Sequence, residues 1–172
     1  MSDWSSPQSA KAQARPSLPQ RAAAYFSIDL PWGKRQPALG RFLTGAAVSV
    51  IASLAACAVI VAVGTAIFPA TAGYEHFRFL DYAKLTVPGV VAASLAWPMV
   101  TLLSSRALRL FAWLTVAVTV GGMAPDAWIL LRGDSPDAVL VLVAMHLALA
   151  AVTFPALVFL APQRHGPRAS QG

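Results

Sequence analysis

The longest uncharged stretch of the chain is the feature that most restricts its fold. It runs from Phe42 to Phe68, 27 residues ended by Pro69. A helix of this length reaches about 40 Å, more than the roughly 30 Å hydrocarbon core of a bilayer. The stretch therefore predicts a tilted transmembrane helix. A cleaved signal peptide is the alternative, because Ala70-Thr71-Ala72 resembles a cleavage site, but the apolar run is longer than such peptides carry.

Three further apolar stretches follow, at about 85–103, 108–131 and 138–160. Only 12% of the residues are charged, about half of the share usual in soluble domains. The sequence thus predicts an all-α fold, an integral membrane four-helix bundle over residues 42–161.

The distribution of Lys and Arg predicts the orientation of this bundle. Ten of them lie in residues 1–41, in the loop after the second span or in residues 162–172, and three lie in the other two loops. Positively charged loops stay in the cytoplasm. We therefore expect a multi-pass protein of the cytoplasmic (plasma) membrane with both termini cytoplasmic.

Residues 1–41 form a cytoplasmic leader. Up to about Arg21 the leader is rich in Ser, Ala, Gln and Pro without an apolar period, which predicts a largely disordered N-terminal segment. Residues 25–35 combine aromatic and basic side chains suited to the headgroup layer. The predicted interfacial anchor consists of Tyr25, Phe26, Trp32, Lys34 and Arg35.

Two ionisable residues lie inside predicted spans, Asp126 in the third and His146 in the fourth. Such residues cost about 2.5–3.5 kcal/mol on insertion and call for a partner, water or a function. They are expected about 8 and 12 Å deep from the same membrane surface, on consecutive antiparallel helices. We therefore predict an intramembrane polar pair, although a wetted Asp126 and a His146 bonded to a carbonyl are alternatives.

Helical spacing adds a supporting polar face to this pair. Pro125, beside Asp126, is expected to weaken the helix and to free carbonyl groups. The supporting residues are Thr115, Thr119 and Gly122 on the third span and Thr153 on the fourth.

The first span carries a stripe of small residues at i+4 spacing, which lets another helix approach closely. Packing within the bundle is one interpretation, and a docking face for a second copy or a larger complex is the other. The stripe consists of Gly45, Ser49, Ser53 and Cys57.

Several classes of function lack the residues they need. Cys57 is the single cysteine, and the chain has no phosphate-binding loop, hydrolase or RNA-binding motif. Haem would need a second histidine at membrane depth, whereas His76 and His165 lie outside the spans. We therefore expect no enzyme activity, no cofactor, no metal and no nucleic-acid partner.

Three sequence segments carry a family resemblance: SLAWPM (94–99), RALRLFAW (106–113) and MHLALAAVTFPAL (145–157). In these the chain resembles a family of small actinobacterial four-span membrane proteins with a domain of unknown function. The resemblance covers roughly residues 40–160 and implies a four-span fold with no established activity.

Two main functional hypotheses follow. The first is a small non-enzymatic accessory or stabilising subunit of a larger inner-membrane complex, since the stripe and the leader suit docking to a membrane-protein partner. The alternative is a proton-coupled carrier or small-ligand-binding membrane protein, as a homo-oligomer, using Asp126 and His146. A membrane enzyme acting on lipid or quinone is a third, weaker hypothesis.

Overall fold

The computed structural model describes residues 17–30 and 36–164, and this part of the chain is helical apart from its connections. Two 3-10 turns, η1 (Pro69–Thr71) and η2 (Glu75–Phe77), lie between α2 and α3. The α-helices are α1 (Leu18–Phe26), α2 (Leu39–Ile67), α3 (Phe79–Leu103), α4 (Ala107–Gly122), α5 (Ala124–Leu131) and α6 (Pro136–Leu160).

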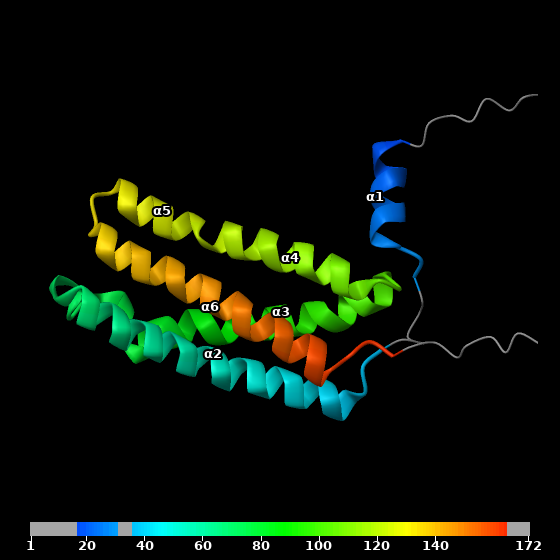
Figure 1. The fold of residues 1–172 in the computed structure, drawn as a ribbon, viewed down its shortest axis with the longest axis horizontal. Helices are drawn as coiled ribbons and strands as arrows, with labels where there is room; N and C mark the ends of the chain where they lie inside the picture. The colour runs from blue at the N-terminus through cyan, green and yellow to red at the C-terminus, as the bar shows by residue number, and fades with distance from the viewer. Residues whose placement is uncertain (1–16, 31–35, 165–172) are drawn as a thin grey trace, which may run out of the picture.

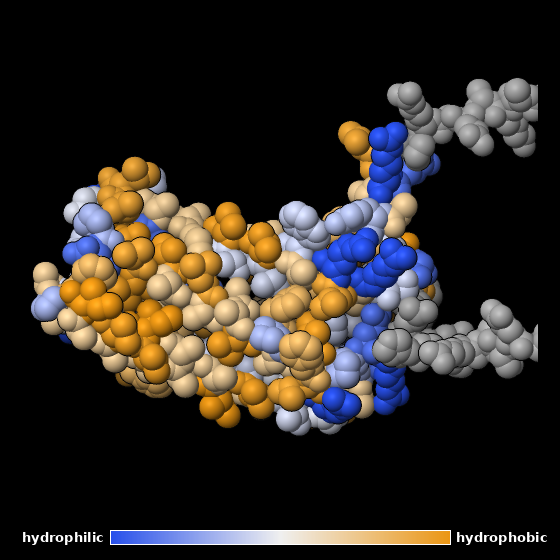
Figure 2. All heavy atoms as spheres, viewed as in Figure 1, coloured by the Kyte–Doolittle hydropathy of each residue, from blue (hydrophilic) through white to orange (hydrophobic). Residues whose placement is uncertain are grey.

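Four segments are long and apolar enough to cross a membrane: α2, α3, α4 together with α5, and α6. Apolar side chains cover much of the visible side of the bundle, and strongly hydrophilic residues gather at the end where the chain begins (Figure 2). Large side chains such as Ile51 and Val118 are exposed along the helices. This surface suits a multi-pass membrane protein, because lipid replaces water around the apolar side chains.

The helices run up and down in sequence order (Figure 1). The α3–α4 turn lies at the same end of the bundle as the start of α2 and the end of α6, whereas the α2–α3 and α5–α6 connections lie at the opposite end. Helix α6 contacts α2, α3, α4 and α5. The last span is therefore the central packing element of the bundle.

Two of the predicted spans begin earlier than expected. Helix α2 begins at Leu39, so Arg41 lies in its first turn, where its Nε donates to the carbonyl oxygen of Leu160 at 2.9 Å. Helix α3 begins at Phe79 and includes Asp81 and Lys84, which pair at 3.3 Å. The hydropathy pattern missed both helical turns because they contain charged residues. In the structure these charges have partners, which an average over a sequence window does not detect.

The small-residue stripe of α2 faces the inside of the bundle. All four of its residues are buried. Gly45 lies near the backbone of Ala156 in α6, Ser53 Oγ is 3.2 Å from Thr153 Oγ1, and Cys57 Sγ is 3.9 Å from Thr86 Oγ1 of α3. The stripe therefore packs against helices of the same chain, and it does not offer an outer face to another protein.

Trp97 joins α3 to the end of α6. It is 1% exposed, its ring lies 5.0 Å from that of Phe111 in α4, and its Nε1–H donates to the carbonyl oxygen of Ala161 at 2.7 Å. A buried indole needs such an acceptor. The contact fixes three helices at the end of the bundle that carries the α3–α4 turn.

The predicted disorder of the leader up to about Arg21 is wrong for residues 18–21, which form the first part of α1. The Ser17 N–H donates to Gln20 Oε1 at 2.9 Å, Pro19 stands in the first turn, and three alanines follow. These residues favour helix initiation and propagation. Composition alone concealed this short helix because its flanks are polar.

The segment after α1 is attached to the α3–α4 turn. Arg109 donates to the Tyr25 carbonyl oxygen at 3.2 Å, and its guanidinium lies 4.8 Å from the centre of the Tyr25 ring. Ser104 Oγ donates to the Phe26 carbonyl oxygen, and the Leu30 N–H donates to Leu103 at 3.2 Å. Of the predicted interfacial anchor, Tyr25 and Phe26 therefore contact the bundle, and Trp32, Lys34 and Arg35 lie outside the described residues.

Candidate functional site

A break in the third span places Asp126 toward the fourth. Helix α4 ends at Gly122, and α5 begins at Ala124 with Pro125 and Asp126 in its first turn. Proline lacks the N–H that would continue the ladder of hydrogen bonds, which accounts for the break beside Met123. Asp126 is only 5% exposed although it lies in the first turn of a short helix.

His146 lies in α6 opposite this break. Its Nδ1 is 3.1 Å from the Leu142 carbonyl oxygen and also 3.1 Å from Asp126 Oδ2. A carbonyl oxygen can only accept, so the hydrogen bond to Leu142 places the hydrogen on Nδ1. That single hydrogen cannot serve both oxygens well. The two predicted residues are therefore in contact, and the alternative of a carbonyl-bonded His146 holds at the same time.

The Asp126 carboxylate keeps an unsatisfied oxygen. Its Oδ2 is buried and, within the described part of the chain, has no hydrogen-bond partner, because the close Nδ1 contact is not aligned as a hydrogen bond. An unpaired carboxylate oxygen at this depth is costly. Such a group calls for a structural or functional explanation.

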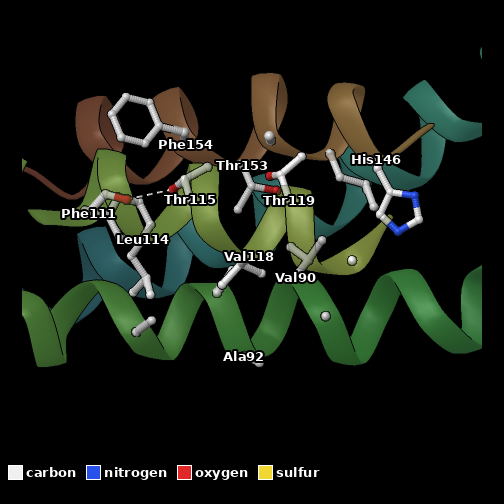
Figure 3. A pocket seen from close by; sticks show the side chains of 16 residues that line it. Val90, Ala92, Phe111, Leu114, Thr115, Val118, Thr119, His146, Thr153 and Phe154 are labelled. Atoms are coloured by element: carbon white, nitrogen blue, oxygen red, sulfur yellow. Dashed lines mark hydrogen bonds between the residues drawn. The ribbon is translucent and has the colours of Figure 1, made fainter. Parts of the chain in front are cut away.

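Two cavities meet at His146. The larger, about 410 Å³, lies between α3, α4 and α6 (Figure 3). The smaller, about 180 Å³, lies nearer the α2–α3 connection and is lined by Asp126, His76 and Asp81. His146 and Leu149 line both cavities. The imidazole therefore stands between an outer cavity that contains carboxylates and a largely apolar inner one.

The predicted supporting face lines the inner cavity. Thr115, Thr119, Gly122 and Thr153 all belong to its wall, and Figure 3 shows the threonines between His146 and Phe154. Thr115 Oγ1 donates to the Phe111 carbonyl oxygen at 2.9 Å. This hydroxyl is thus bonded within its own helix, which leaves the wall largely apolar.

Sequence reasoning missed the contribution of α3 to the site. Gly89, Ala93 and Ala96 line the inner cavity, and Asp81 and Tyr82 line the outer one. The three small residues recur at +4 and +3 on one helical face, a pattern that could have indicated a groove. His76 was also missed as a site residue, because it lies in the connection before α3.

The η1–η2 connection lies beside the outer cavity. The Tyr74 ring packs edge-on against His76 at 5.2 Å and against Phe77 at 5.2 Å. Burial raises the pKa of the Tyr74 hydroxyl, and the carboxylates of Asp134, Glu75 and Asp126 raise it further. Tyr74 therefore stays neutral at physiological pH, and its ring packs against the lining residue His76 without adding a charge.

In the described ranges, 17–30 and 36–164, no group of three or more His, Cys, Asp or Glu side chains lies close enough together to hold a metal ion.

Gly122 lets the imidazole approach α4. A Cβ added at Gly122 would lie 3.1 Å from His146 Cδ2 and 3.3 Å from Nε2, whereas one added at Gly121 would meet nothing within 4 Å. We expect Gly122→Ala to lower the free energy of unfolding by about 1–2 kcal/mol relative to Gly121→Ala, because it displaces His146. Denaturant unfolding of both variants in mixed micelles measures this difference. Equal stability of the two variants would show that His146 does not pack on Gly122.

A comparison with protein-family models gives one match. The family model described as a family of unknown function, DUF6069, matches residues 33–162, well over half of the chain. The chain belongs to the DUF6069 family. The matched region contains all four apolar spans and both residues of the polar pair, but excludes α1. No curated protein and no solved structure matches the chain.

Membership in the family confirms the resemblance in its coarser form. The family is one of unknown function, as expected. An actinobacterial origin and a four-span count for the family as a whole remain predictions.

Proposed function

We propose that this chain is a membrane protein that binds a small, largely apolar molecule between α3, α4 and α6, with Asp126 and His146 at its polar end. The observation that carries the proposal is the meeting of the two cavities at His146, beside the unsatisfied Oδ2 of Asp126. A volume of about 410 Å³ lies in the range of small-molecule sites, about 300–1,000 Å³.

The accessory-subunit hypothesis depended on two docking elements, the stripe of α2 and the leader, and of these the stripe is buried against α6 and α3. The polar pair, in contrast, lies where the inner and outer cavities meet. We therefore propose binding, and carriage of the ligand where binding is coupled to protonation of His146, in a protein that performs no chemical conversion.

The proposed orientation places the end with α1 and the α3–α4 turn in the cytoplasm. Arg21, Arg41, Arg106, Arg109 and Arg164 all belong to this end. The excess of positive charge supports a cytoplasmic location. The outer cavity with Asp126 then opens near the opposite membrane surface.

Adjacent alanines of α6 provide the test. Ala150 lines the inner cavity, whereas Ala151 is exposed on the outside of the bundle. We expect wild-type protein in phosphatidylcholine nanodiscs to bind 1-octanol saturably above the level of empty discs. Ala150→Phe should abolish this binding because the ring fills the cavity, and Ala151→Phe should retain it.

Isothermal titration calorimetry of the three proteins gives the comparison. Binding that is absent in the wild type, or equal in Ala150→Phe and Ala151→Phe, would refute the proposed site. Circular dichroism of each variant confirms that the helical fold is kept.

A further inference from the structure

The described side chains that line the outer cavity include carboxylates but no permanent cation. The ionisable side chains that line it are Asp81, Asp126, His76, His146 and Tyr82, with no Lys or Arg among the described lining residues. Asp81 Oδ1 is already 3.3 Å from Lys84 Nζ. Asp126 therefore has no cationic partner from Lys or Arg in this cavity.

His146 serves the carboxylate poorly as a donor. Its Nδ1 hydrogen is directed to the Leu142 carbonyl oxygen, and its Nε2–Cδ2 edge lies against Gly122. The Asp126 side chain lines the outer cavity and is 7% exposed, and its Oδ2 is buried without a hydrogen-bond partner among the described residues. A buried anionic oxygen of this kind binds a charged N–H donor most strongly.

The inner cavity sets the rest of the ligand. Its wall is formed mainly by Ala, Val, Leu and Phe side chains, and it meets the outer cavity at His146 and Leu149. We propose that the site takes an amphiphile with an ammonium head group, with the head at the Asp126 carboxylate and the hydrocarbon chain in the inner cavity. This inference rests on the proposed function and names its ligand class.

Three probes with one chain and different heads test the charge preference: octylammonium, 1-octanol and octanoate. Calorimetry in phosphatidylcholine nanodiscs at pH 7.5, corrected with empty discs, should show octylammonium bound at least about tenfold more tightly than octanol, the effect of one charge-assisted hydrogen bond. Octanoate should bind most weakly. Asp126→Asn should remove the advantage of octylammonium and keep octanol binding, whereas Asp134→Asn, in the exposed α5–α6 connection, should keep both.

The outcomes separate this inference from the proposed function. Equal binding of octylammonium and octanol, or a preference for octanoate, would overturn the ammonium assignment and leave the apolar site intact. Failure of all three probes to bind would refute the proposed function itself. If Asp126→Asn does not fold, the comparison of octylammonium with octanol in the wild type decides the matter.

Discussion

Replacing Gly64 by alanine is expected to cause a large loss of stability, about 2–3 kcal/mol in the free energy of unfolding. A Cβ at this position would lie 2.6 Å from Val141 Cγ2 and 3.0 Å from Val141 Cγ1. Val141 is itself buried in α6, so neither helix can yield without loss of packing. Reversible unfolding by sodium dodecyl sulfate, followed by circular dichroism in mixed micelles, measures the change.

Two controls isolate this contact. Gly89→Ala in α3 meets no atom within 4 Å and should be neutral or stabilising by up to about 1 kcal/mol, because alanine favours helix. Val141→Ala should restore much of the stability of Gly64→Ala in the double variant. If the double variant were as unstable as the sum of the two single ones, Gly64 and Val141 would not be in direct contact.

Asp126→Asn is expected to change stability in the opposite direction. The wild-type carboxylate is buried with an oxygen that has no hydrogen-bond partner among the described residues. An uncharged amide removes the cost of burying an incompletely paired charge, about 1–3 kcal/mol. We therefore expect a higher free energy of unfolding at pH 7.5 in the absence of ligand. A stabilising substitution at a binding site is a known consequence of function being maintained at the expense of stability.

Asp134→Asn is the control for this prediction, because Asp134 is exposed outside the bundle, and it should change stability by less than about 0.5 kcal/mol. The same titration with sodium dodecyl sulfate gives both values. A loss of stability in Asp126→Asn would mean that the carboxylate is well paired in the native state, contrary to the contacts described above.

The sequence was sufficient to predict the four spans, since uninterrupted apolar runs such as Phe42–Phe68 permit little else in a chain with few charges. It was not sufficient to predict where a helix begins when its first turns contain charged or polar residues. Asp81 and Lys84 are part of α3 because they pair with each other, and α1 forms because of local capping at Ser17 and Gln20. Both effects depend on single hydrogen bonds or ion pairs that average hydropathy does not report.

The polar pair was predictable in its members and not in its geometry. Depth along two antiparallel helices placed Asp126 and His146 near each other, and the structure has them 3.1 Å apart. The competing acceptor, the Leu142 carbonyl oxygen, arises from the side-chain rotamer of His146 and has no counterpart in the sequence pattern. The two cavities likewise depend on the spacing between the helices. Small residues such as Ala93 allow a cavity to form, but their presence does not predict one.

The stripe of α2 shows the limit of a pattern in a single helix. The stripe indicated close helix packing, and its four residues, Gly45, Ser49, Ser53 and Cys57, are indeed buried in the bundle. The spacing gave no information on whether the neighbouring helix belongs to the same chain. Contacts with Ala156, Thr153 and Thr86 answer that question for this structure.

The most direct test of the account is ¹⁵N nuclear magnetic resonance of histidine-labelled protein in phosphatidylcholine nanodiscs, with His146 assigned by its loss in His146→Gln. We predict that His146 carries its hydrogen on Nδ1 at pH 7.5, because that atom donates to the Leu142 carbonyl oxygen. Adding octylammonium should shift the His146 resonances saturably in the wild type and not in Ala150→Phe. A hydrogen on Nε2 would contradict the hydrogen bond from His146 to the Leu142 carbonyl oxygen. His146 resonances that octylammonium leaves unchanged would contradict a ligand site at the junction of the two cavities.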